Sequence, residues 1–214
     1  MKRLLLCTCF FTLIFSCSTS DDVQENNLEL NFYGLTVGNS YTYKFYKYNS
    51  DTEDYDETLI VQNVIIEDTE EVSGQQYFKI KTTTSGVDGF NLFYLQNGEE
   101  IDYLREVDGT LINDNNDVLF VNNEFSEHLV NSDNTSLNLY RKTIEEPVII
   151  NSNTGSFNCI EMQNYIVTED GTTLDGVSKI HYSEGVGLVQ QTCVYASSST
   201  PVMIKKLNSY NIQN

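Results

Sequence analysis

The sequence has little of several residue types that mark common protein classes. It contains no tryptophan, two prolines and two histidines, and its 12 basic residues stand against 31 acidic residues, which gives a net charge of −19. Because a chain this acidic repels phosphate backbones and anionic lipid head groups, we expect no nucleic-acid partner. Neither proline interrupts a candidate strand, since Pro147 and Pro201 each stand just ahead of one.

No apolar run is long enough to span a membrane. The longest, residues 4–15, follows two cations and has roughly a dozen residues, whereas a spanning helix needs about 20. This pattern is typical of an export signal peptide. Ser16 and Cys17 end the run, and a small residue directly before a cysteine resembles the lipobox of bacterial lipoproteins, although Phe15 is bulkier than that position usually holds. The resemblance implies cleavage before Cys17 and membrane attachment through lipid on Cys17.

The segment after the expected cleavage site is polar and acidic. Residues 17–27 contain no run of core residues, so they are predicted to form a flexible tether that begins at the lipidated cysteine. Their Ser/Asp stretch, residues 18–22, is similar to the surface-export signal of Bacteroidetes lipoproteins. That resemblance implies an outer-membrane location, on the cell surface rather than the periplasmic face. The organisation expected is a signal peptide at 1–16, the tether, and one domain at 28–214.

Alternation of β-branched and aromatic residues with polar residues predicts strands along most of this domain. We expect an all-β fold with a strongly curved antiparallel meander, half-barrel or barrel-like, because a dozen short strands must protect their edges. A two-sheet sandwich is the alternative. The best helix candidate, residues 123–130, is short, so at most one short helix is expected. The candidate strands are residues 41–48, 58–67, 75–84, 90–95, 101–107, 118–121, 137–141, 148–151, 156–168, 176–183, 187–196 and 202–207.

Tight turns are predicted where glycine follows asparagine, aspartate or serine, since these pairs tolerate positive φ. Asp108-Gly109 and Asn97-Gly98 are the strongest hairpin signals, and Gly185 and Gly187 flank a tight reversal. The remaining turn pairs are Ser73-Gly74, Asp88-Gly89, Asp170-Gly171 and Asp175-Gly176.

The cysteines favour free thiols over a disulfide. Two of the five leave with the signal peptide and Cys17 is the lipid site, so Cys159 and Cys193 remain in the domain. A meander with turns near 171 and 185 places Cys193 opposite Val177, and Val177 opposite Tyr165. Cys159 is then two strands away and six residues along, beyond the limit of about 7 Å between bridged Cα atoms. Two buried free thiols are therefore expected.

Several short segments, taken in order, resemble a widespread set of uncharacterised all-β lipoproteins of Bacteroidetes, of flavobacterial type. The resemblance covers most of the mature chain and implies a curved antiparallel sheet. It supplies no catalytic residues and no cofactor. The segments that carry it are residues 37–43, 74–80, 103–109, 154–159 and 182–189.

Aromatic residues near the start of the domain are the most prominent candidate for a binding surface. Aromatic side chains are favoured in strands in any case, so core and cross-strand packing is the preferred interpretation. Strand alternation nevertheless places Tyr46 and Tyr48 on the face opposite Tyr41 and Tyr43. With Tyr55, this pair forms a speculative ligand platform. The full cluster comprises Phe32, Tyr33, Tyr41, Tyr43, Phe45, Tyr46, Tyr48 and Tyr55.

Metal and catalytic signals are weak. The acidic stretches 51–57 and 114–117 offer oxygen ligands, but they lack the spacing of a known Ca²⁺ loop and are better explained as solvated hairpin tips. His181 shares the more polar face of its strand with Lys179 and Ser183, which is not a nucleophilic triad, and no G-x-S-x-G elbow exists. We therefore expect no metal, no cofactor and no catalytic residues.

These observations leave three functions open. The first is a non-enzymatic surface module that binds a glycan, a peptide, an apolar ligand or an envelope protein. The second is a structural or assembly lipoprotein of the envelope that holds a lipid or a partner protein. The third is a hydrolase with a carboxylate pair. A shallow aromatic groove with a polar rim would favour the first, a large apolar cavity the second, and two carboxyls about 5–10 Å apart in a deep cleft the third.

Overall fold

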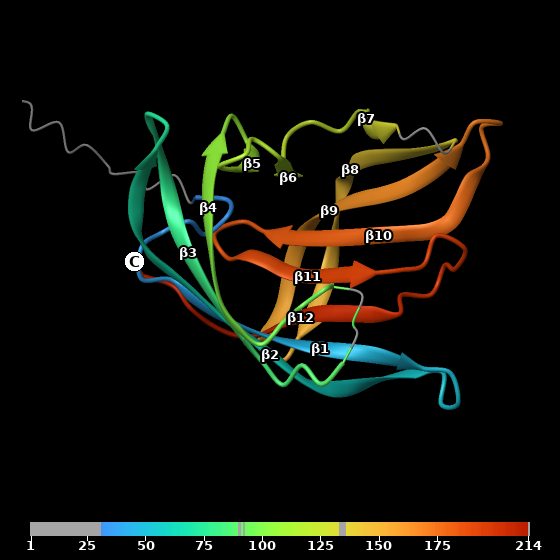
Figure 1. Cartoon of the computed structure of the whole chain (residues 1–214), viewed down its shortest axis with the longest axis horizontal. Coiled ribbons are helices and arrows are strands. Elements are labelled where there is room, and N and C mark those ends of the chain that lie inside the picture. The colour runs from blue at the N-terminus through green and yellow to red at the C-terminus, as the bar shows by residue number, and fades with distance from the viewer. Residues whose placement is uncertain (1–30, 90, 92, 133–135, 214) are drawn as a thin grey trace, which may run out of the picture.

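The computed structural model describes residues 31–89, 91, 93–132 and 136–213, and these form one 12-stranded antiparallel sheet (Figure 1). The strand order is β6-β5-β4-β3-β2-β1-β12-β11-β10-β9-β8-β7, so the chain makes two six-stranded meanders that meet where β1 pairs with β12. Strands that are consecutive in the chain, β6 and β7, therefore form the two edges of the sheet. The all-β curved meander is confirmed, and the sheet does not close.

The strand bounds follow the two meanders. The first comprises β1 (Ser40–Asn49), β2 (Asp54–Val72), β3 (Gln75–Ser85), β4 (Gly98–Val107), β5 (Thr110–Asn113) and β6 (Val118–Val121). The second comprises β7 (Glu127–Ser132), β8 (Leu137–Ser152), β9 (Gly155–Thr168), β10 (Thr173–Ser183), β11 (Gly187–Cys193) and β12 (Met203–Asn211).

The sheet curls strongly because bulges interrupt its ladders. Register shifts occur in β1 between Lys44 and Tyr46, in β2 between Ile66 and Asp68, and in β10 between His181 and Tyr182. The curl brings the outer edge of β6 back to β8, near the top of the view in Figure 1, although the two strands form no ladder. Side chains of β8 occupy the exposed carbonyls of β6 instead. The Arg141 guanidinium donates to Val118 O at 2.5 Å and the Thr143 hydroxyl to Val121 O at 2.9 Å, which protects that edge.

A hairpin adds a second layer on the convex face. The end of β8 and the start of β9 extend past the ladder with β10 and pack across β11 and β12 (Figure 1). A hydrogen bond of 2.9 Å from Asn153 to Asn208 fixes the tip, and the Phe157 and Tyr210 rings meet edge to face. Pro147 lies in the bulge where β8 bends to make this crossing, a position where proline is tolerated in a strand. The hairpin buries Cys159 completely.

Two of the predicted elements are wrong. Residues 123–130 form no helix; Glu127–Ser132 is the edge strand β7, because its backbone pairs with the long strand β8 from Glu127 opposite Lys142 onward. The described part of 90–95 forms no strand but belongs to the loop between β3 and β4. In that loop the Asn97 side chain bonds both Val87 N and Val87 O, so Asn97-Gly98 closes a long loop rather than a two-residue hairpin.

The turn and cysteine predictions fare better. Asp108 and Gly109 have φ of 48° and 77° and join β4 to β5, as a two-residue hairpin requires. Asp175-Gly176 is not a turn, because Gly176 lies inside β10 where its amide donates to Ala196 O. Cys159 and Cys193 form no disulfide, as expected; Cys159 is buried, whereas Cys193 is only partly buried.

Candidate functional site

The concave face of the sheet contains a cavity of about 170 Å³. Residues from β1, β2, β3, β4, β5, β10, β11 and β12 line it, together with the segment that precedes β1, so both meanders contribute. Its walls are mostly aromatic and aliphatic, and charged groups are few. The residues that give it chemical character are Tyr33, Tyr41, Tyr43, Tyr182, Asp102 and Lys205.

Strand alternation explains why these residues meet. The odd-numbered positions of β1 point inward, which buries Tyr41, Tyr43 and Phe45. Across the junction of the two meanders, β12 places Leu207 opposite Tyr43 and Lys205 opposite Phe45. Lys205 is therefore carried to the concave face by the same alternation that buries the aromatic rings.

Three of the four tyrosine hydroxyls are already hydrogen bonded to the backbone. Tyr33 donates to Gly109 O at 2.5 Å, Tyr41 to Gly34 O at 3.0 Å and Tyr43 to Leu188 O at 3.0 Å. Burial raises the pKa of Tyr41 to about 12. The fourth hydroxyl, that of Tyr182, has no hydrogen-bond partner among the described residues, although burial also raises its pKa. Tyr182 thus presents an unpaired hydroxyl to the cavity.

Lys205 is a second unpaired donor, and the Thr82 hydroxyl is a third. Its ammonium lies over the Tyr43 ring at 4.3 Å and 6.0 Å from the centre of the Phe45 ring, and it forms no ion pair with any described carboxylate. Burial lowers the pKa of Lys205 to about 8, against the opposing influence of the Asp102 carboxylate. Asp102 remains partly exposed at the β4 rim. Its own pKa is raised by desolvation and by the neighbouring charges of Glu100 and Asp114.

The cavity size limits what it can hold. An apolar protein cavity of about 150 Å³ accommodates benzene, whereas pockets for drug-sized ligands span about 300–1,000 Å³. At about 170 Å³, this cavity has room for one ring or a short alkyl chain. It is lined by rings, with polar groups at two points, and is therefore closer to an aromatic groove with a polar rim than to a large apolar cavity.

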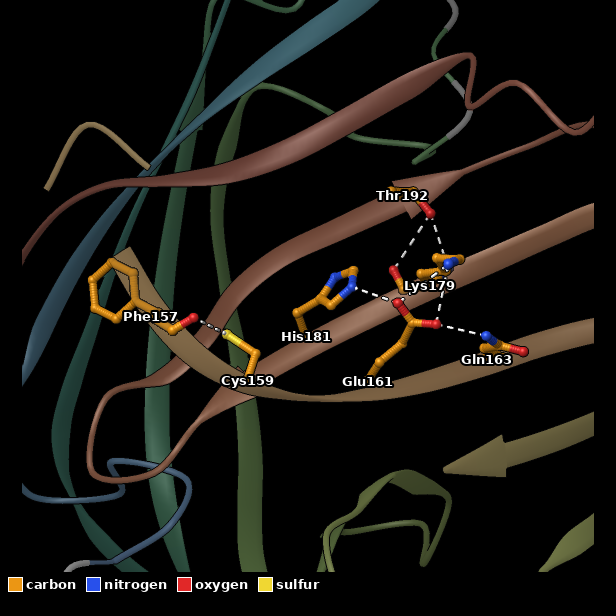
Figure 2. A network of polar contacts seen from close by, with 7 residues as sticks. All are labelled: Phe157, Cys159, Glu161, Gln163, Lys179, His181 and Thr192. Carbon is orange, nitrogen blue, oxygen red and sulfur yellow. Dashed lines mark hydrogen bonds and ion pairs between the residues drawn. The ribbon is translucent and has the colours of Figure 1, made fainter. Parts of the chain in front are cut away.

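A second polar cluster lies on the convex face of β9 and β10, near the crossing hairpin (Figure 2). The Glu161 carboxylate accepts from His181 Nε2 at 2.9 Å, from Gln163 at 2.6 Å and from Lys179 Nζ at 3.2 Å. Burial alone would raise the pKa of Glu161, but these three donors outweigh it and lower the pKa to about 2. His181 is 2% exposed, and its Nδ1 has no partner among the described residues.

The sequence located this cluster only in part. Alternation correctly placed His181 on the face it shares with Lys179, but it gave no indication that this polar face is buried. Glu161 was missed entirely. The available signal was the predicted turn at Asp170-Gly171, because a meander through that turn aligns β9 with β10 and sets Glu161 directly opposite His181.

The speculative platform of Tyr46, Tyr48 and Tyr55 does come together on the convex side. Tyr48 and Tyr55 are directly paired across β1 and β2 with ring centroids 5.4 Å apart. All three rings are half-buried, and two hydroxyls are engaged, that of Tyr55 with Pro201 O and that of Tyr46 with Glu57. A ligand on this surface stays a prediction.

A serine, a histidine and a glutamate meet between β6 and β7, but not as a catalytic triad. Ser126 Oγ lies 3.2 Å from His128 Nε2, and the Glu124 carboxylate contacts the same nitrogen. A triad needs the serine and the carboxylate on opposite ring nitrogens, so this geometry cannot relay a proton from serine to histidine. Glu124 and His128 border a hollow of about 640 Å³ in which Arg141 is already bonded to Val118 O.

The structure shows no group of metal ligands among the residues that it describes. No three histidine, cysteine, aspartate or glutamate side chains gather there. The acidic stretch 114–117 and the first three residues of 51–57 lie at hairpin tips, whereas residues 54–57 form the start of β2. None of the described residues forms a helix long and apolar enough to cross a membrane. Cys17 and the whole tether, residues 17–27, lie outside the described residues.

The fold is similar to two solved structures from Bacteroidetes. One is a predicted lipoprotein from Parabacteroides distasonis, with a TM-score of 0.50, 14% identity, and coverage of 85% of this chain and 98% of that one. The other is a predicted exported protein with a YmcC-like fold from Bacteroides fragilis, with a TM-score of 0.48, 12% identity, and coverage of 85% and 99%. No family model and no curated protein matches the sequence. At such identities the similarity concerns the fold alone.

Proposed function

We propose that this chain is a lipid-anchored envelope protein whose β domain binds a small ligand in the concave cavity without chemical conversion. The anchor part of the proposal rests on the signal peptide and Cys17, together with the resemblance to surface lipoproteins of Bacteroidetes. The binding part rests on one observation: an aromatic cavity of about 170 Å³ that contains three side-chain hydrogen-bond donors, Thr82, Tyr182 and Lys205, without partners among the described residues.

The cavity favours binding of a small molecule over the two alternatives. A structural lipoprotein that holds a whole lipid would need a larger apolar cavity than one sized for a single ring. A hydrolase with paired carboxylates needs two of them, and the described lining of this cavity includes a single carboxylate, that of Asp102. Lipid storage and glycoside hydrolysis are therefore the less favoured functions for this site.

A ligand screen with a cavity-filling variant tests this proposal. The mature protein, solubilised in detergent, would be titrated with ring-sized and short-chain compounds, charged and neutral, and its melting temperature followed. A ligand at 100-fold its dissociation constant should stabilise the fold by about 2.7 kcal/mol. Val64→Phe, which fills the cavity from β2, should remove the shift. Ile65→Phe, on the next residue with its side chain on the convex face, should keep it.

Two outcomes would contradict binding in the cavity. One is a folded wild-type protein that melts cooperatively and shifts with no compound in the screen. The other is a shift that survives Val64→Phe but disappears in Ile65→Phe, which would place the ligand on the convex face instead.

A further inference from the structure

We propose that the ligand of the concave cavity is a small monocarboxylate, with its apolar body between the tyrosine rings and its carboxylate bound by Lys205 Nζ. This inference rests on the proposed binding function and specifies the chemical class of the ligand.

The polar groups that line the cavity differ in whether they already have a hydrogen-bond partner. The hydroxyls of Tyr33, Tyr41 and Tyr43 are committed to backbone carbonyls, so they have no proton left to donate to a ligand. The donors left without a hydrogen-bond or ion-pair partner among the described residues are the Thr82 hydroxyl, the Tyr182 hydroxyl and the Lys205 ammonium. All three can donate, and a carboxylate forms its strongest hydrogen bonds with a charged donor, which here is Lys205.

The charged side chains of the cavity favour a ligand with a single negative charge. A cationic ligand would be repelled by Lys205, and a neutral ligand would leave its desolvated ammonium with no counter-charge nearer than the Asp102 carboxylate, which does not form an ion pair with it. A single negative charge supplies that counter-charge. A second one would face Asp102 at the rim, with Glu100 beside it on the same face of β4, and these two carboxylates disfavour dianions.

The interior of the cavity favours a ligand with an apolar body. Tyr33, Tyr41 and Tyr182 surround the interior, together with Ile66, Ile80 and Leu111, so the end of the ligand away from Lys205 meets rings and aliphatic side chains. The volume of about 170 Å³ admits one ring or a short chain. Aromatic and short aliphatic monocarboxylates meet both requirements.

The binding should depend on pH in a defined way. The titratable groups that line the cavity with Lys205 are Asp102 from β4, Tyr41 and Tyr43 from β1, Tyr182 from β10, and Tyr33. Burial raises the pKa of each of these tyrosines, so Lys205, with a pKa of about 8 in the free protein, is the lining group that titrates between pH 7 and 9. Affinity for a carboxylate should therefore fall as the pH rises from 7 to 9, with proton uptake on binding near pH 8.

The test compares acids with neutral analogues of the same shape. Calorimetric titration of the mature protein with benzoate and benzamide, and with hexanoate and hexanamide, should show the acid binding at least about tenfold more tightly. Lys205→Met should remove that advantage while leaving amide affinity within about threefold. Lys206→Met, the adjacent lysine over the Tyr46 ring on the convex face, is the matched control and should behave as wild type.

Lys205→Met should fold, because it replaces a desolvated ammonium with an apolar chain of similar length, and its circular dichroism would be checked first. If the amides bind as well as the acids, or if the acids keep their advantage in Lys205→Met, the carboxylate assignment is overturned while ligand binding in the cavity stands. If neither acids nor amides bind the folded wild-type protein, both the assignment and the binding function proposed for the cavity fail.

Discussion

At the scale of single residues, the buried Glu161 and the partly buried Lys205 lie in opposite kinds of surroundings. On the convex face, Glu161 is surrounded by donors from His181, Gln163 and Lys179. On the concave face, Lys205 has no counter-charge within ion-pair distance in the described part of the chain. When a buried charge has several hydrogen-bond donors, removal of one partner destabilises the folded state. A charge that is held away from water without a partner lowers the stability of the fold. The first cluster therefore serves the fold, and Lys205 has the properties of a binding residue.

Glu161→Gln tests the structural role of the convex cluster. Glu161 has a pKa of about 2 in the folded protein and 4.5 as its ordinary value. Its contribution to stability is therefore fully present above pH 4.5 and is lost as the pH falls toward 2. We expect the substitution to lower the free energy of unfolding by about 2–4 kcal/mol at pH 7, because it leaves the donors of His181 and Lys179 without their charged acceptor.

Urea denaturation of wild type and variant at pH 7, 5 and 3 would measure this difference, which should shrink between pH 5 and 3. Glu145→Gln removes an exposed carboxylate on β8, the other strand of the same hairpin; it is the control and should change stability by less than about 0.5 kcal/mol. A loss that is equally large at pH 3 would contradict the electrostatic explanation and indicate a packing defect.

The residue-scale predictions succeeded where strand alternation decides the outcome. Alternation separated Tyr41 and Tyr43 from Tyr46 and Tyr48, and the structure places these pairs on opposite faces. Alternation could not show that a face is covered. The burial of His181 depends on a hairpin that crosses the convex side, and Lys205 gains its role from rings on other strands. Such contacts between distant segments leave no local signal.

At the scale of elements, short turns and close approaches fix the curvature around the cavity. Gly187 begins β11 with φ of 95° and lines the cavity, and an added Cβ would lie 2.7 Å from Tyr33 O. Only glycine meets both constraints, because other residues rarely adopt this φ and the neighbouring atom is backbone. The turn before β11 therefore positions Tyr33 as well as the strand itself.

Gly187→Ala should cost more than glycine substitution at an unobstructed turn. We expect a loss of about 2–4 kcal/mol in the free energy of unfolding, from the combination of strained φ and steric overlap with Tyr33 O. Gly74→Ala is the matched control: its φ is 79°, but nothing lies within 4 Å of an added Cβ, so only the conformational cost of about 1 kcal/mol remains. Urea unfolding midpoints would give both values, and equal losses would show that the contact with Tyr33 does not matter.

An element was predicted correctly where its own residues determine its structure, and wrongly where contacts with distant residues determine it. Asp108-Gly109 was predicted correctly because the turn is encoded by its own two residues. Residues 90–95 and 123–130 were not, since short apolar segments have no intrinsic preference strong enough to decide between loop, helix and strand. In β7 the decision comes from the ladder with β8. In the loop before β4 it comes from the Asn97 side chain, which bridges to Val87.

At the scale of the whole molecule, the pairing of β1 with β12 joins the two meanders and creates the cavity between them. Local patterns predicted a strongly curved meander, and this is confirmed, but they carry no information on which strands meet at a distance of some 170 residues, as Ser40 and Asn211 do. The two edges that remain are close together, and Thr143 and Arg141 occupy the backbone of one of them. The register between distant strands therefore decides that the sheet remains a half-barrel and does not close. Alternation in the sequence does not specify that register.

The predicted attachment to a membrane is tested at this same scale, through Cys17. When the full chain is expressed in a bacterial host supplied with an alkyne-tagged fatty acid, wild type should incorporate the label and Cys17→Ser should not, because the thiol of that residue is the expected acylation site. Cys159→Ser is the matched control and should keep the label, since the Cys159 thiol is fully buried and its pKa is raised to about 12 by desolvation. Each buried methylene of an acyl chain contributes about 0.8 kcal/mol, so the labelled protein should remain in the membrane fraction until detergent is added.

Label on Cys17→Ser would refute the assignment of the anchor to Cys17. An unlabelled wild-type protein released in soluble form would refute the lipoprotein prediction itself, while leaving the cavity and its ligand to be judged on their own tests.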